Sequence, residues 1–269
     1  ADSNLGTVLM EQRRFAQAAV AFRDSLVATQ ALAARDPGNA DYPNSMIESY
    51  AWLADALEGS GKLDDAIGQR ERELAVAGQL AAKSSDVELR RSAVVAHRAL
   101  GRLLTSRNQL GAGLAHLDTS TRIADTLVAT EPGNSQWLQY AAWSQLDLGG
   151  LLLLNGQKDN AASAVRKGCD LTARLIAKDR SVVEWNDRLR RGCAMGRARL
   201  ALANGSTGEA LALAQDAARS TAVTVAAKAD TRLAIASARA LIGDIRAATG
   251  DEAGARRDWL AARAALPED

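Results

Sequence analysis

Side chains that could do chemistry are few in this sequence, which has two histidines and two cysteines among 269 residues. The histidines, His97 and His116, fall on two consecutive predicted helices. Zinc is held by sets of three or four His, Cys or carboxylate ligands at short spacings. No such set surrounds either histidine in the sequence. We therefore expect both to be structural or surface residues, and we predict no metal site and no cofactor.

The cysteines, Cys169 and Cys193, lie on either side of a predicted connection between helices near Lys178. Antiparallel helices would place them at a similar height. A disulfide needs Cα atoms within about 7 Å, whereas packed helices run about 8–10 Å apart. The expectation is two small buried thiols, and a redox pair is the alternative.

The glycine pairs do not have the pattern of phosphate-binding loops. Gly149-Gly150 and Gly111-Ala112-Gly113 lack the Lys-Ser/Thr ending and a preceding strand. Gly59-Ser60-Gly61 is expected to be a turn between helices. Because no catalytic set of residues is found, we predict that the chain is not an enzyme.

Two arginines one helical turn apart, Arg98 and Arg102, could bind a carboxylate through forked hydrogen bonds. The alternative is that they are solvated or paired with Asp and Glu of neighbouring helices.

Small residues that recur along the whole chain indicate the elements that position these side chains. We call them anchor residues, and they are separated by 45 to 49 positions: Gly6, Ala54, Gly101, Gly149, Ala198 and Gly243. A second small residue follows each anchor residue after twelve positions: Ala18, Ala66, Gly113, Ala161, Ala210 and Ala255. A fixed period in this range is typical of stacked structural repeats.

Each repeat is predicted to be two helices joined by a short turn. The turns are expected beside Gly61, Gly156, Gly205 and Gly250, because glycine readily takes the left-handed conformation just past a helix end. The two small residues of a repeat then lie opposite each other. Without bulky side chains there, the two helix backbones can approach closely.

This pattern resembles the tetratricopeptide repeat, whose consensus places W-x2-L-G-x2-Y before A-x3-F. The resemblance runs from Leu5 to about Ala265. The period departs from the 34 residues of the family. The proline that usually closes a repeat is missing from its place, and two repeats run on to Asp36-Pro37-Gly38-Asn39 and Glu131-Pro132-Gly133-Asn134. The longer form looks like the C-terminal arrays of some bacterial signalling proteins, including serine/threonine kinases.

The resemblance implies an all-α fold, a right-handed superhelical stack of about six antiparallel helical hairpins. We expect a single repeat domain over residues 1–269. Its expected repeats are 1–36, 37–84, 85–132, 133–180, 181–228 and 229–266. Gly6 has fewer residues before it than the other anchor residues have, so we expect a piece of a longer chain. The alternative is a naturally short capping helix.

In the arrays that this chain resembles, the first helix of each hairpin lines a concave groove. Carried over, this makes partner-binding candidates of Glu48, Asp55, Glu58, Arg98, Arg102, Trp143 and Arg199. The Lys/Asn/Asn/Lys/Arg carboxylate clamp of the family is not reproduced, so that ligand is not expected. For Trp143 the alternative is simple core packing.

The net charge of +1 gives no electrostatic drive toward nucleic acid or membrane. The sequence contains no run of about 18 apolar residues, the length that a helix needs to span a bilayer. A cytoplasmic location is expected. The first functional hypothesis is a non-catalytic scaffold that binds a peptide or protein. The second is a regulatory or self-associating module of a larger bacterial signalling protein.

Overall fold

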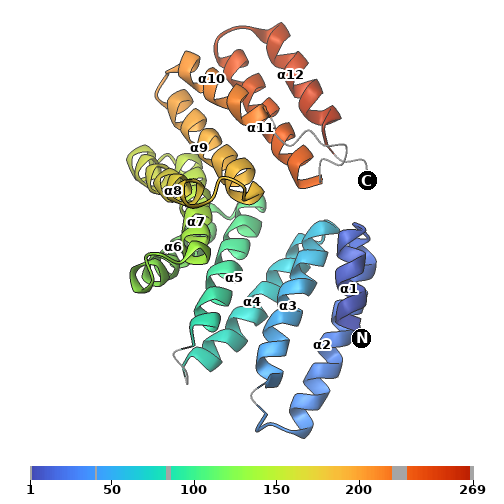
Figure 1. The fold of residues 1–269 in the computed structure, drawn as a ribbon. Coiled ribbons are helices and arrows are strands. Elements are labelled where there is room, and N and C mark those ends of the chain that lie inside the picture. The colour runs from blue at the N-terminus through green and yellow to red at the C-terminus, as the bar shows by residue number, and fades with distance from the viewer. Residues whose placement is uncertain (1, 40, 83–85, 220–228, 267–269) are drawn as a thin grey trace. The chain divides into compact units, whose positions relative to one another are not determined.

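The computed structural model describes residues 2–39, 41–82, 86–219 and 229–266, which are all-helical, without a strand. The expected all-α class is therefore confirmed. The helices pair as antiparallel hairpins (Figure 1). Their bounds are α1 Asp2–Glu11, α2 Phe15–Arg35, α3 Asp41–Gly59, α4 Leu63–Ala81, α5 Val87–Ser106, α6 Leu110–Thr130, α7 Ser135–Leu154, α8 Lys158–Lys178, the π-helix η1 Glu184–Leu189, α9 Arg190–Ala203, α10 Thr207–Ala218, α11 Ala229–Ala248 and α12 Glu252–Ala264.

The chain divides into two compact units, unit 1 with residues 1–130 and unit 2 with residues 131–269. Unit 1 holds α1 to α6 and unit 2 holds α7 to α12. The division falls beside the predicted boundary between the third and fourth repeats. That all six repeats form one domain stays a prediction.

The anchor residues lie where two helices of a hairpin approach most closely. A Cβ built on Gly149 would lie 2.6 Å from Val165 Cγ2 and 3.4 Å from the carbonyl oxygen of Ala161. A Cβ on Gly101 would lie 2.7 Å from Leu117 Cγ. Gly6 and Gly243 face Phe22 and Trp259 in the same way. A larger side chain at these positions would push the two helices apart.

The turns fall at the same place in all six hairpins. Gly61, Gly156, Gly205 and Gly250 all have φ between +75° and +82°, which confirms the four turns expected from glycine. The equivalent residues of the first and third hairpins are Arg13 and Asn108, with φ of 59° and 60°. The left-handed conformation is thus a property of the repeat and not only of its glycines.

One helix differs in its course. The first helix of the fifth hairpin begins with the π-helix η1, whose hydrogen bonds span five residues instead of four, and continues as α9. The second helix of this hairpin, α10, ends at Ala218. The expected end of the fifth repeat, at residue 228, lies outside the described residues.

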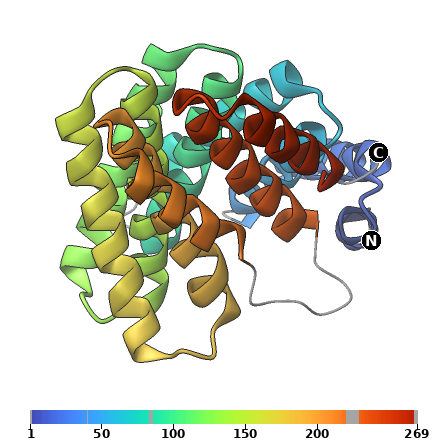
Figure 2. The same ribbon diagram turned by 90° about the horizontal axis from the view of Figure 1, so that it is seen from above.

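The core of the last two hairpins differs from the core of unit 1. In unit 1, large residues such as Phe22, Leu53 and Leu57 are almost fully buried. In the C-terminal part of unit 2, alanines supply most of the core: Ala194, Ala198, Ala201, Ala210, Ala214, Ala217 and Ala238. There α11 and α12 run side by side, as both views show (Figures 1 and 2).

Candidate protein-interaction surface

All seven predicted partner-binding residues lie on first helices of hairpins. In unit 1 these are Glu48, Asp55 and Glu58 on α3 and Arg98 and Arg102 on α5. In unit 2 they are Trp143 on α7 and Arg199 on α9. Each unit therefore carries its own set.

Glu58 and Arg102 connect neighbouring first helices in unit 1. Arg102 Nη2 lies 3.9 Å from Glu58 Oε1, and the two side chains are 53% and 37% exposed. An exposed ion pair of this kind contributes only about 0–1 kcal/mol. A charged group of a partner can therefore displace either member at little cost.

Asp55 is engaged inside unit 1. The buried guanidinium of Arg70 donates hydrogen bonds to Asp55 and, over 2.7 Å, to Glu73 Oε2. Burial raises the pKa of Glu73 to about 7, against the opposing charge and hydrogen bond of Arg70. Asp55 thus helps to neutralise a buried arginine, and a role in partner binding stays a prediction for it.

The other charged candidates of unit 1 differ in exposure. Glu48 is exposed on α3. Arg98 is half-buried on α5, where its side chain already interacts with another group of the protein. Arg102, one turn after Arg98, is exposed. Joint binding of a carboxylate by the two arginines stays a prediction.

Trp143 and Arg199 lie in different surroundings in unit 2. The half-buried Trp143 ring meets Tyr140 edge-on, with ring centroids 5.8 Å apart. The Arg199 side chain reaches the surface, but partial burial lowers the pKa of its guanidinium, against the opposing charges of Asp244 and Asp147. Trp143 therefore belongs to an aromatic cluster on α7, and Arg199 to a mixed-charge surface.

The two histidines form a pair between α5 and α6. His97 Nδ1 and His116 Nδ1 are 2.8 Å apart, so one ring donates the hydrogen bond and the other accepts it. The pKa of His97 is lowered to about 4, mainly by burial and to a smaller extent by the charges of His116 and Arg122. Burial also lowers the pKa of His116, against the opposing charge of Glu71. Among the described residues, no group of three or more His, Cys, Asp or Glu could hold a metal ion.

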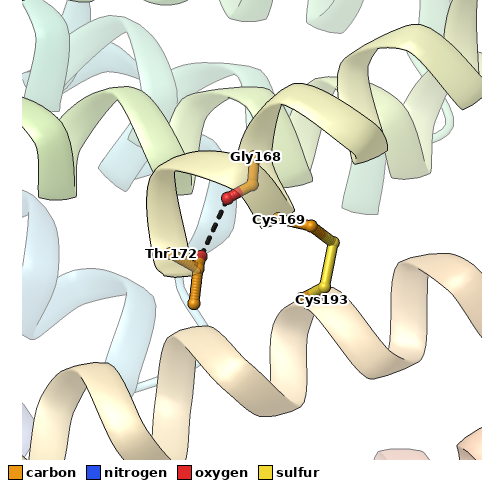
Figure 3. The surroundings of a disulfide bond; sticks show 4 residues. All are labelled: Gly168, Cys169, Thr172 and Cys193. Atoms are coloured by element: carbon orange, nitrogen blue, oxygen red, sulfur yellow. Dashed lines mark hydrogen bonds between the residues drawn. A yellow bond between two sulfur atoms is a disulfide. The ribbon is translucent and has the colours of Figure 1, made fainter. Parts of the chain in front are cut away.

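The expectation of two separate thiols is wrong: Cys169 on α8 and Cys193 on α9 form a disulfide (Figure 3). Their Cα atoms are 5.2 Å apart, within the range that a disulfide requires. The usual spacing of about 8–10 Å is measured between helix axes, and because Cα atoms lie about 2.3 Å from the axis, facing Cα atoms come closer than the axes do. Beside the bond, Thr172 Oγ1 donates a hydrogen bond to the carbonyl oxygen of Gly168 (Figure 3).

One glycine, Gly196, lies at the contact between α9 and α8, where a Cβ would be 3.1 Å from Val165 Cγ1. Gly168 and Gly192, which adjoin the two cysteines in the sequence, instead face Leu146 of α7.

Comparison with known proteins identifies the fold. No protein-family model matches the sequence, and no curated protein matches it. Among solved structures, the apo form of RapI is similar with a TM-score of 0.70 and 12% identity, covering 98% of this chain and 82% of that one. BtubC (BKLC) from P. vanneervenii is similar with a TM-score of 0.61 and 13% identity, over 92% and 89%.

A third similar structure has repeats of the expected kind. It is the putative kinesin light chain from Podosopora anserina, with nearly identical TPR-like repeats, a TM-score of 0.53 and 18% identity. It covers 84% of this chain and 97% of that one. This chain is therefore an array of tetratricopeptide-like helical hairpins, as the sequence pattern predicted.

No helix in the described ranges is both long enough and apolar enough to cross a lipid bilayer.

Unit 1 has a hollow between α4, α5 and α6 that was not predicted from the sequence. The signal that could have indicated it is the series of small residues Ala75, Gly78 and Ala81 on one side of α4.

Proposed function

We propose that the chain is a non-catalytic protein-interaction scaffold that binds a peptide or partner protein on the first helices of its hairpins. The observation that supports this most directly is the exposed Glu58–Arg102 pair, which spans α3 and α5 within a tetratricopeptide-like array. Opposite charges on adjacent first helices suit a partner segment that carries both signs of charge.

The proposed surface of unit 1 is tested by site-specific crosslinking. A photoreactive amino acid replaces the exposed Glu48 on α3, and crosslinked species are identified by mass spectrometry from cells that express the protein. We expect a specific partner that is lost when Arg102→Glu is added, because the reversed charge repels the acidic group that Arg102 would bind.

Arg72→Glu provides the matched control, since Arg72 is an exposed arginine on α4, a second helix. Equal loss of the crosslink with Arg72→Glu, or no loss with Arg102→Glu, contradicts the assignment to first helices. Crosslinks only to a second copy of the chain would favour the alternative, a self-associating module of a larger protein.

A further inference from the structure

Unit 1 contains a hollow of about 620 Å³ on a different set of side chains from the proposed interaction surface. It lies between α4, α5 and α6. Its apolar lining includes Leu74, Ala77, Leu89, Ala93 and Ile123. Volumes of 300–1,000 Å³ with mostly apolar walls are typical of small-molecule sites.

The hollow exists because α4 presents small residues to it. Ala75, Gly78 and Ala81 line one wall at intervals of three residues, which places them on one side of the helix. No heavy atom outside the helix backbone lies within 4 Å of a Cβ built on Gly78. Space that a leucine would fill in a packed repeat is therefore open here.

Positive charge borders this apolar space. Arg90 on α5 and Arg122 on α6 line the hollow, and both are exposed. Among the described residues, neither forms an ion pair. Ser120 Oγ donates to the carbonyl oxygen of Val94 over 2.9 Å, which sets the register of the two antiparallel helices. In that register Arg90 and Arg122 lie within about 3 Å of each other along the helix axis.

The remaining titratable groups leave the hollow with a positive balance. His97 lines one end and is neutral at physiological pH, as its low pKa requires. Its partner His116 is held by the Nδ1 hydrogen bond. Glu71 is the one carboxylate among the lining residues that the structure describes, and its charge acts on His116. Two guanidinium groups therefore face one carboxylate.

We propose that this hollow is a binding site for a small organic anion with an apolar body and a single carboxylate. The apolar body would lie against Ala77, Leu89 and Ala93, and the carboxylate would accept charge-assisted hydrogen bonds from Arg90 and Arg122. The site is independent of the proposed protein-interaction surface.

The size of the hollow favours a small molecule over a protein segment. Along α4 it extends from Glu71 to Ala81, which is about 15 Å of helix. A stable protein interface covers roughly 800 Å² of each partner, far more than one side of a helix of this length presents.

The probe is 2-naphthoate, with the neutral 2-naphthamide as its uncharged match, and binding to the full chain is followed by ligand-observed NMR titration. We expect a dissociation constant on the order of 1 mM or tighter for 2-naphthoate. The amide should bind at least about tenfold more weakly, because it cannot form charge-assisted hydrogen bonds. The double variant Arg90→Gln/Arg122→Gln should show the same loss for the acid.

Two glycines on α4 supply a matched pair of variants. Gly78→Leu fills the hollow, whereas Gly68→Leu makes the same change at a position on the same helix that does not line it. Both positions are open to a side chain, and leucine favours helix over glycine. Both variants should therefore fold, which is checked by circular dichroism and melting.

Loss of 2-naphthoate binding in Gly78→Leu, with binding retained in Gly68→Leu, is the result expected. Retained binding in Gly78→Leu overturns the site, and so does equal loss in both variants. Equal affinity for the acid and the amide overturns the anionic class of ligand.

Discussion

Among the residues that the structure describes, each unit buries one arginine, and the two arginines are held differently. Arg70 in unit 1 contacts two carboxylates, Glu73 inside the core and Asp55, which is 42% exposed. Arg191 in unit 2 has one carboxylate, the buried Asp187 at 2.5 Å, and the carbonyl oxygen of Ala217 at 2.8 Å. In both arginines Nε has no hydrogen-bond partner.

Both arginines replace an apolar residue of the repeat. The residues equivalent to Arg70 in other hairpins are Phe22, Leu117, Val165, Ala214 and Trp259. Those equivalent to Arg191 are Ile47, Val94, Ala142 and Ala236, all buried. A repeat can therefore accept a buried charge at a core position if a residue one helical turn away on the same helix supplies a carboxylate. The number of carboxylates around the arginine determines how much stability is lost when one of them is removed.

The largest effect is expected from breaking the buried ion pair between Arg191 and Asp187 in unit 2. Asp187→Ala leaves Arg191 buried with only a carbonyl oxygen, and we expect a loss of about 3–5 kcal/mol in the free energy of unfolding. Asp55→Ala in unit 1 leaves Glu73 beside Arg70, so we expect a smaller loss of about 1–2 kcal/mol. Denaturant unfolding measures both, and equal losses would contradict the comparison.

The disulfide is the second difference between the units, because only unit 2 holds cysteines. Reduction by dithiothreitol should lower its free energy of unfolding by about 3 kcal/mol, as expected for a cross-link closing a loop of this length. Hydrogen exchange should accelerate in α8 and α9 and stay unchanged in α3 and α4. The variant Cys169→Ser/Cys193→Ser should not respond to the reductant, and a response there would point to another cause.

Acid should act on unit 1 through the histidine pair. The pKa of His97 is about 4 in the fold against 6.5 for a free histidine, so the unfolded chain takes up the proton first and stability falls as the pH drops from about 6.5 toward 4. Since His97 is only partly buried, we expect the free energy of unfolding to fall by roughly 1–2 kcal/mol over this pH range.

The raised pKa of Glu73 acts in the opposite direction, favouring the fold as the pH falls from about 7 toward 4.5. The measurement is therefore the difference between the parent and His97→Asn at each pH. A difference that does not vary with pH would contradict the assigned titration.

The smallest expected effect concerns the turns, which in unit 2 all use glycine and in unit 1 use Arg13, Gly61 and Asn108. Asn108→Gly should stabilise unit 1, and the reciprocal Gly156→Asn should destabilise unit 2, each by less than about 1 kcal/mol. Thermal melting compares the two, and a loss in Asn108→Gly would show that the asparagine side chain stabilises its turn.

The sequence alone predicted the all-helical class, the hairpin pattern and the four glycine turns. This was possible because small residues and left-handed turns are local features that recur in every repeat. The disulfide was missed because the spacing of helix axes was compared with a limit on the distance between Cα atoms, and the facing Cα atoms of Cys169 and Cys193 lie closer together than helix axes do. The contact of Asp55 with Arg70 could not be predicted, because nothing local shows that Arg70, at an apolar position of the repeat, is buried and needs a carboxylate.

The π-helix η1 has a consequence for the spacing of the repeats. From Gly149 to Ala198 the interval is 49 residues, whereas the three preceding intervals are 47 or 48. A π turn takes up one residue more than an α turn, because its hydrogen bonds reach five residues along the chain. A single inserted residue can thus be absorbed inside a helix, and everything beyond it keeps its orientation toward the preceding hairpin.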